Sequence, residues 1–148
     1  MFPTNFSYEL FETYISGNTN NINFQSISDY ESFYGRKSYA DQTAGGYYSV
    51  RLAILERLYT MKKKASVIAL RFITPYYLVP LGVFVTREAA RKSLNSKELS
   101  FDSMELMFDY AKILIKKNFK FDLELIFKKS TLVRDLRTQK RLNNFFRV

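Results

Sequence analysis

The sequence predicts an α/β domain, with α+β as the alternative, in which a small sheet is flanked by helices. Three observations carry this prediction: a helical apolar spacing in residues 45–64, a change of period over 65–73 with a continuous apolar run at 67–70, and a second long helical stripe at 102–117. The chain has 148 residues, of which 47% are hydrophobic, so it is long enough for one ordinary core and too short for two. We therefore expect a single compact domain.

The amino-terminal segment is expected to form a short helix followed by a loop. Thr4 or Asn5 can cap a helix that ends at Ile15. The segment 16–28 is rich in asparagine and serine and shows no clear period, so we expect a loop there. Four residues at helical spacing form the apolar side of the expected helix: Phe6, Leu10, Phe11 and Tyr14.

The segment 29–48 has the composition of a binding loop, because it combines tyrosine, arginine, acidic residues and glycine. Gly45 and Gly46 lie at its end, where the next helix begins. Two interpretations of these glycines stay open: ordinary turn and cap formation, which we favour, and an anion site near 43–47 formed by the amide donors of the helix.

The central block is expected to run helix, strand, strand, helix. The first helix presents four apolar residues on one face: Tyr48, Leu52, Leu55 and Tyr59. In the segment 65–73 residues 67–70 are continuously apolar and β-branched residues are prominent, which is typical of a strand covered on both faces, so we expect it to be buried. Residues 81–85 read as a second short strand, and Thr86 can cap a helix that ends at Leu94.

The carboxy-terminal third is expected to add a long helix, a strand and a final helix. The long helix begins near Asp102 and carries a methionine and phenylalanine stripe, which is more often core than cofactor site. Residues 119–127 alternate apolar and polar side chains, which predicts a half-buried strand paired with one of the central strands. A basic helix then begins at Ser130 or Thr131.

Cysteine and histidine are both absent, which excludes a disulfide framework, a thiolate zinc site and the commonest general base. Carboxylates, lysines and tyrosines remain for acid–base chemistry, but none occurs at a spacing that we can tie to a reaction. The sequence leaves open whether the protein is an enzyme, and it predicts no metal site and no cofactor. No leader or apolar span is visible, so we expect a cytoplasmic, nucleoid-associated protein.

The net charge of +9 is unevenly distributed. Residues 1–45 hold two cations and five carboxylates, a net charge of −3, so the remainder carries +12. Such an excess attracts polyanions, although lysines on solvated helix faces also serve solubility alone. For Arg87 and Arg91 we favour an exposed helix face with a local ion pair to Glu88. The candidate nucleic-acid contacts are Lys62, Lys63, Lys64, Arg87, Arg91, Lys140 and Arg141.

The last ten residues carry a compact apolar pattern. Gln139, Leu142, Phe145 and Phe146 occupy positions i, i+3, i+6 and i+7, and residues three apart eclipse each other in a 3₁₀ turn. This pattern resembles the PCNA-interacting peptide, which implies that the leucine and phenylalanines enter a hydrophobic pocket of the sliding clamp while the glutamine hydrogen-bonds beside it. The alternative is a terminal helix that packs Leu142 and Phe146 onto its own core.

Four segments, 8–12, 29–58, 65–94 and 139–146, occur in an order and spacing that resemble the carboxy-terminal portion of the archaeal Nre family of DNA repair proteins. The resemblance implies a role in the response to DNA damage and contact with the clamp through the terminal peptide. Members of that family are longer and carry a cysteine-bearing, zinc-finger-like part that this chain lacks, so no metal-dependent property is carried over. A separate chain could supply that part.

Our first hypothesis is therefore a DNA repair accessory protein with a domain at 1–138 and a flexible clamp-binding tail at 139–148. A clamp-tethered enzyme is the second hypothesis, and it requires a cleft in which Asp41 and Glu88 meet the arginines. A domain that binds nucleic acid non-specifically is the third.

Overall fold

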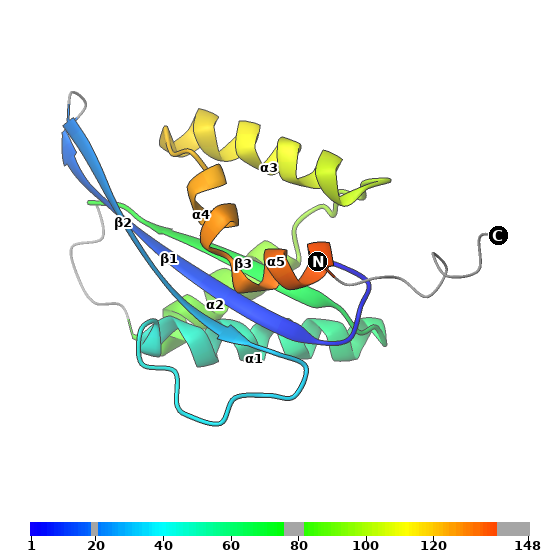
Figure 1. Cartoon of the computed structure of the whole chain (residues 1–148). Helices are drawn as coiled ribbons and strands as arrows, with labels where there is room; N and C mark the ends of the chain where they lie inside the picture. Colours follow the sequence, from blue (N-terminus) through cyan, green and yellow to red (C-terminus); the bar gives the residue numbers. More distant parts are fainter. Residues whose placement is uncertain (19–20, 76–81, 139–148) are drawn as a thin grey trace.

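A three-stranded sheet forms the centre of the computed structural model, which describes residues 1–18, 21–75 and 82–138 (Figure 1). Strand β1 (Ser7–Asn18) lies in the middle. It pairs antiparallel with β2 (Asn21–Glu31) and parallel with β3 (Ser66–Ile73), which gives the strand order β2-β1-β3. The central position of β1 means that both of its edges are hydrogen-bonded to neighbouring strands.

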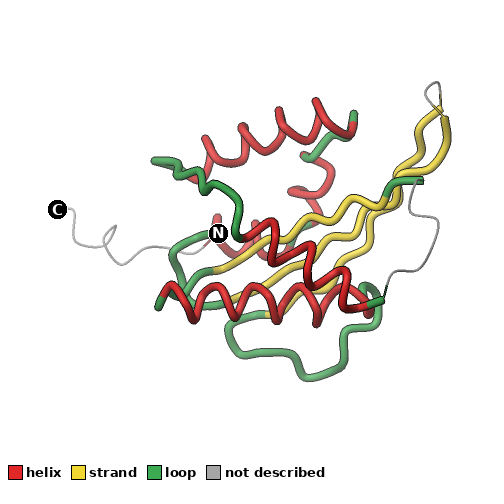
Figure 2. Tube along the Cα trace, turned by 180° about the vertical axis from the view of Figure 1, so that it is seen from behind, coloured by secondary structure: helices red, strands yellow, loops and turns green. Residues whose placement is uncertain are grey.

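Helices cover both faces of the sheet, as Figures 1 and 2 show from opposite sides. On one face lie α1 (Ala44–Met61) and α2 (Val83–Leu94). On the other lie α3 (Met104–Phe119), α4 (Glu124–Lys129) and α5 (Thr131–Thr138). The architecture is one compact α+β domain, in agreement with the predicted class. Among the described residues, no helix is long and apolar enough to cross a membrane.

Two apolar clusters form the core, one on each side of β1. Tyr8 and Leu10 point to the α1 side, where they pack with Tyr47 of that helix. Phe11 points to the opposite side, where it packs with Phe108 of α3 and further residues of α4 and α5. This alternation follows from the period of two along a strand.

The predictions for the first thirty residues were wrong. The expected helix 4–15 is β1, and most of the expected loop 16–28 belongs to β2. Because β1 is buried on both faces, its apolar residues do not alternate strictly and their spacing also fits a helix. β2 is rich in polar residues, and it is a strand because its backbone pairs antiparallel with that of β1. The local sequence pattern of β2 does not reveal this pairing.

Two further strand predictions were wrong. Residues 83–85 begin α2, and 81 lies outside the described residues. The alternating segment 119–127 contains the last residue of α3 and the first four residues of α4, with Phe121 and Phe127 directed into the core. The helix predicted over 45–64, the strand over 65–73, and the helices near 86–94, 102–117 and 131 are confirmed. The expected burial of the strand was wrong beyond Val67, because β3 is an edge strand and the rest of it is only half-buried.

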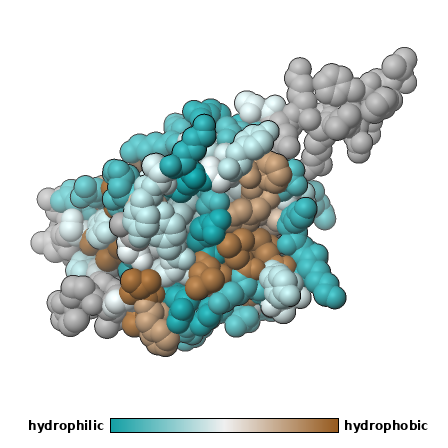
Figure 3. Space-filling model, turned by 90° about the horizontal axis from the view of Figure 1, so that it is seen from below, coloured by the Kyte–Doolittle hydropathy of each residue, from teal (hydrophilic) through white to brown (hydrophobic). Residues whose placement is uncertain are grey.

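The apolar face predicted for α1 lies mostly on the outside. Leu52 and Tyr59 are exposed, whereas Val50, Ile54 and Leu58 face the sheet. This helix is apolar around most of its circumference, so the spacing alone could not choose the inner side. Figure 3 looks at the molecule from below, the side on which α1 lies in Figure 1, and shows an apolar area surrounded by hydrophilic residues.

Candidate functional site

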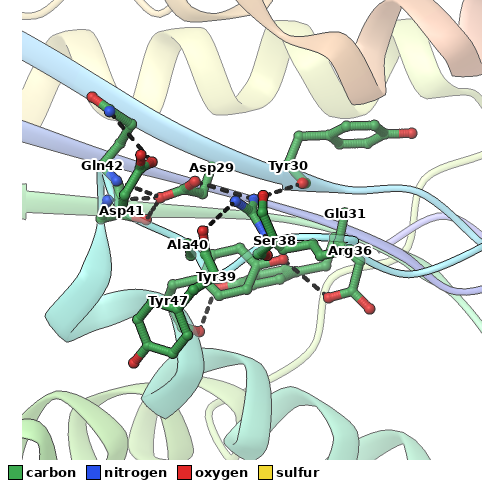
Figure 4. A network of polar contacts seen from close by, with 12 residues as sticks. Asp29, Tyr30, Glu31, Arg36, Ser38, Tyr39, Ala40, Asp41, Gln42 and Tyr47 are labelled. Carbon is green, nitrogen blue, oxygen red and sulfur yellow. Dashed lines mark hydrogen bonds and ion pairs between the residues drawn. The ribbon is translucent and has the colours of Figure 1, made fainter.

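The loop between β2 and α1, residues 32–43, is held by a polar network beneath it (Figure 4). The Asp29 carboxylate accepts hydrogen bonds from the backbone N–H of Gln42 at 3.1 Å, the backbone N–H of Thr43 at 2.7 Å and the Thr43 hydroxyl at 2.9 Å. These donors stand just before the first turn of α1. A carboxylate of the chain thus binds the donors that directly precede α1, which favours an ordinary turn before the helix over a bound anion at Gln42 and Thr43.

Arg36 fastens the loop from within. Its guanidinium donates to the carbonyl oxygens of Tyr30, Ser38 and Tyr39 at 2.9, 3.1 and 3.2 Å, and it pairs with Asp29 at 3.1 Å. The same group lies 5.2 Å from the centre of the Tyr47 ring. The guanidinium has five N–H donors in a fixed plane, so it can bind three carbonyls and a carboxylate at once, which exceeds the three donors of a lysine. Arg36 therefore stabilises the conformation of this loop.

A second ion pair lies at the end of β2. Arg51 of α1 donates two hydrogen bonds to the Glu31 carboxylate, at 2.6 and 2.7 Å, and the Tyr47 hydroxyl donates a third at 3.0 Å. Burial of this carboxylate raises its pKa, but the hydrogen bonds from Arg51 and Tyr47 outweigh burial, so the pKa of Glu31 is lowered overall. Burial and the neighbouring Glu31 raise the pKa of Tyr47, which keeps its hydroxyl protonated.

A third buried carboxylate, Glu12 of β1, lies below the first turn of α1. It pairs with Arg71 of β3 at 2.6 Å. A Cβ atom on Gly46 would overlap the Glu12 carboxylate, so only glycine allows the helix to come this close. Gly46 therefore serves helix–sheet packing.

The outer surface of the loop is aromatic and basic. Tyr34 is 93% exposed, and Phe33 beside it is also exposed. Ser32 and Gly35 close this turn through a backbone hydrogen bond of 2.9 Å, and Gly35 has a φ of 79°. A shallow depression next to the turn is lined by Glu31, Arg36, Lys37, Ser38, Tyr39, Tyr48 and Arg51. This surface can stack planar groups and attract anions.

The predicted basic contacts divide into three groups. Arg91 pairs with Glu56 and Glu88 at 2.7 and 2.5 Å, and Arg87 lies 3.5 Å from Glu88, so both arginines are engaged in ion pairs on the surface of α1 and α2. The hydrogen bonds from Arg91 lower the pKa of Glu56. This arrangement confirms the local ion pair that we favoured for this helix.

Lys62, Lys63 and Lys64 are exposed at the end of α1, and no ion pair involves them within the described residues. Lys140 and Arg141 lie outside the described residues, as do the four tail residues Gln139, Leu142, Phe145 and Phe146.

The carboxylates of the second hypothesis do not meet. Asp41 accepts a hydrogen bond from its neighbour Gln42, whereas Glu88 belongs to the arginine cluster of α2. Across residues 1–18, 21–75 and 82–138, no three carboxylates are placed to hold a metal ion. The arrangement that this hypothesis requires is therefore not formed by these side chains.

The sequence analysis did not identify four buried carboxylates of the sheet, which are those of Glu9, Glu12, Asp29 and Glu31. Glu9 points to the opposite face from Glu12, and there it accepts hydrogen bonds from the Ser130 hydroxyl at 2.5 Å and from the Thr131 and Leu132 amides at 3.1 and 3.0 Å. Burial raises the pKa of Glu9 against the opposing effect of these hydrogen bonds. A correct strand assignment for β1 and β2 would have shown that these acidic residues sit at covered positions.

The fold and the loop define a small α+β domain in which buried carboxylates and arginines fix an exposed loop. The chain belongs to the archaeal Nre family: the family model described as Archaeal Nre, C-terminal, matches residues 31–145. The family resemblance inferred from the sequence is thereby confirmed.

The curated relatives are longer than this chain. It is 35% identical over 134 residues to DNA repair protein NreB of Archaeoglobus fulgidus, a match that covers 89% of this chain and 33% of that protein. It is 42% identical over 77 residues to DNA repair protein NreA of the same organism, covering 52% of this chain and 19% of the relative. It is 29% identical over 99 residues to DNA repair protein NreA of Haloferax volcanii, a match that covers 64% of this chain and 24% of that protein. No solved structure matches the chain.

Proposed function

We propose that this protein acts in DNA repair as an accessory protein that docks on the PCNA sliding clamp through residues 139–148. The observation that carries the proposal is membership of the Nre family, whose curated relatives are named DNA repair proteins. The QxxLxxFF pattern of the tail supports the clamp contact. The tail follows α5, and that helix is fastened to the sheet through Glu9 and through a hydrogen bond of 2.8 Å from Tyr30 to Asp135.

Calorimetric titration into a PCNA clamp of the source organism tests the proposal. The full chain should bind, and a chain that ends at Thr138 should not. Replacing Phe145 and Phe146 with alanine should weaken binding about a hundredfold or more, because buried aromatic anchors dominate such interfaces.

The matched control replaces the two intervening residues Asn143 and Asn144 with alanine and should bind as the wild type does. Equal affinity of the full and truncated chains would refute the clamp proposal. Circular dichroism of the truncated chain should show an unchanged fold, because α5 ends at Thr138.

A nucleic-acid contact is the second proposed function, and the aromatic loop is the observation that favours it. Exposed tyrosines beside cations are the usual platform for bases of single strands. Tyr34 and Tyr39 supply the exposed rings, and Lys37 supplies a cation next to them. Lys63 and Lys64 offer further positive charge at the end of α1.

Fluorescence anisotropy with a labelled single-stranded oligonucleotide tests this contact. Tyr34→Ala should lower the affinity about fivefold to a hundredfold through lost stacking. Replacing Lys63 and Lys64 with alanine should reduce the slope of log affinity against log salt by about 1.4, at about 0.7 per phosphate contact. Arg91→Ala is the control, since Arg91 is engaged with Glu56 and Glu88. If all variants match the wild type, the domain does not bind nucleic acid at these places.

A further inference from the structure

Helix α3 is apolar on two opposite sides. Its inner side packs into the core through Phe108, with Met104, Ala111 and Ile115 beside it. Its outer side carries Leu106, Tyr110 and Ile113, at positions i, i+4 and i+7, which is the spacing of one helix face. A surface helix normally has one apolar stripe and a polar side opposite, so a second stripe indicates that a second layer covers it.

The outer stripe of α3, defined as Leu106, Tyr110 and Ile113, is contacted among the described aromatic rings by Phe101, whose ring lies 5.3 Å from that of Tyr110, and all three of its side chains remain exposed. Leu106 is 55% exposed, Tyr110 is 42% exposed and Ile113 is 69% exposed. Leu114, which lies one turn after Tyr110 on the same helix, is also exposed. In Figure 1, α3 forms the outermost layer on its side of the sheet, with no described element beyond it. Contiguous apolar surfaces of this kind mark interaction sites.

We propose that the outer stripe of α3 binds the part of an Nre protein that lies outside the segment matched by this chain. The curated relatives are much longer than the matched segments, which cover 33% of NreB and 19% of NreA from Archaeoglobus fulgidus. The matching family model describes a carboxy-terminal part, so most of an Nre protein lies outside the matched segment and is a candidate to cover the stripe. The proposal rests on family membership and not on clamp binding.

The charge around the stripe indicates the chemistry of the partner surface. Lys116 and Lys117 in the last turn of α3 are exposed, and Lys120 follows directly. Asp109 forms an ion pair with Lys112 at 2.8 Å. The net positive charge of α3 therefore lies at its carboxy-terminal end, on Lys116 and Lys117. The partner surface should therefore be apolar at its centre and carry carboxylates opposite Lys116 and Lys117.

Co-expression provides the test. The 148-residue chain is tagged and produced together with the two thirds of Archaeoglobus fulgidus NreB that it does not match, as a second polypeptide. Size-exclusion chromatography with light scattering should show a one-to-one complex. Ile113→Asp and Leu106→Asp should each weaken the complex about thirtyfold or more, as expected for a charge placed in a buried apolar contact. Thermal unfolding of the free chain should change little, because both residues are exposed in it.

Tyr59→Asp on α1 is the matched control, since Tyr59 is also an exposed apolar residue but lies on the opposite side of the sheet. It should leave the complex intact. The proposal is overturned if no complex forms, if Ile113→Asp binds as the wild type does, or if Tyr59→Asp is the variant that weakens binding. A dimer of the free chain that Ile113→Asp dissociates would also overturn it, because the occupant would then be a second copy. Binding of each variant to PCNA, measured separately, keeps this test distinct from the clamp proposal.

Discussion

Replacing Gly46 with alanine tests the helix–sheet contact at the base of the loop. In the structure a Cβ atom at this position would overlap the Glu12 carboxylate and would approach Leu10. The carboxylate cannot move freely, because it is buried and paired with Arg71 at 2.6 Å. Gly46→Ala must therefore either displace α1 or break the Glu12–Arg71 pair.

The expected loss of stability can be derived from the Glu12–Arg71 ion pair that the substitution would break. A hydrogen bond to a charged group contributes about 1.5–3 kcal/mol, and a buried carboxylate left without partners costs about 1–3 kcal/mol. We expect Gly46→Ala to lower the free energy of unfolding by about 2–4 kcal/mol. For a domain of this size that corresponds to a fall in Tm of about 4–16 °C.

The neighbouring glycine provides the control. Gly45 is exposed, and a Cβ atom there would meet nothing within 4 Å. Gly45→Ala should therefore stabilise the helix by up to about 0.5–1 kcal/mol. Urea unfolding followed by circular dichroism measures both variants. In a Glu12→Ala background Gly46→Ala should cost little, since the overlap is removed. Equal stability of Gly46→Ala and Gly45→Ala would show that Glu12 does not lie below the first turn of α1.

Two further substitutions test the carboxylates that hold the loop and α5. Arg36→Ala should lower the free energy of unfolding by about 2–4 kcal/mol and speed amide exchange in residues 33–42, because it leaves Asp29 without its cation; unchanged exchange would refute the fastening role. Glu9→Ala should cost about 2–4 kcal/mol, because it removes the acceptor for the amino-terminal amides of α5. Burial raises the pKa of Glu9 in the fold, so the charged form is the less favourable one. The stability of the wild type relative to Glu9→Gln should therefore rise as the pH falls from 8 toward about 4.3, and a constant difference would contradict the raised pKa.

The parts of the fold that local pattern determines were predictable. The helix at 45–64 and the apolar strand at 65–73 have the length and period of α1 and β3, and the structure confirms both. β1 and β2 were missed because their stability comes from pairing with each other and from burial on both faces of β1. The segment 119–127 was misassigned because a short helix placed after a turn can mimic alternation.

The polar site was predictable in composition but not in geometry. The segment 29–48 stood out as a binding loop by its tyrosines and arginine, and the structure presents Tyr34 and Tyr39 at its surface. The role of Arg36 as a fastener depends on carbonyl groups that no side-chain pattern encodes. Likewise, the ion pair between Glu12 and Arg71 joins residues 59 positions apart, which only the pairing of β1 with β3 brings together.

The two proposed contacts support each other through the length of the tail. Ten residues span at most about 33–36 Å when extended, so a tail docked on the clamp keeps the domain within that reach of the clamp surface. DNA threaded through the clamp would then meet the loop surface at an effective concentration set by the tether, of the order of millimolar for a short flexible linker. A loop with few free cations, such as the one around Lys37, can therefore act on DNA with weak intrinsic affinity. The corresponding prediction is that Tyr34→Ala weakens binding to free oligonucleotides while clamp binding is unchanged.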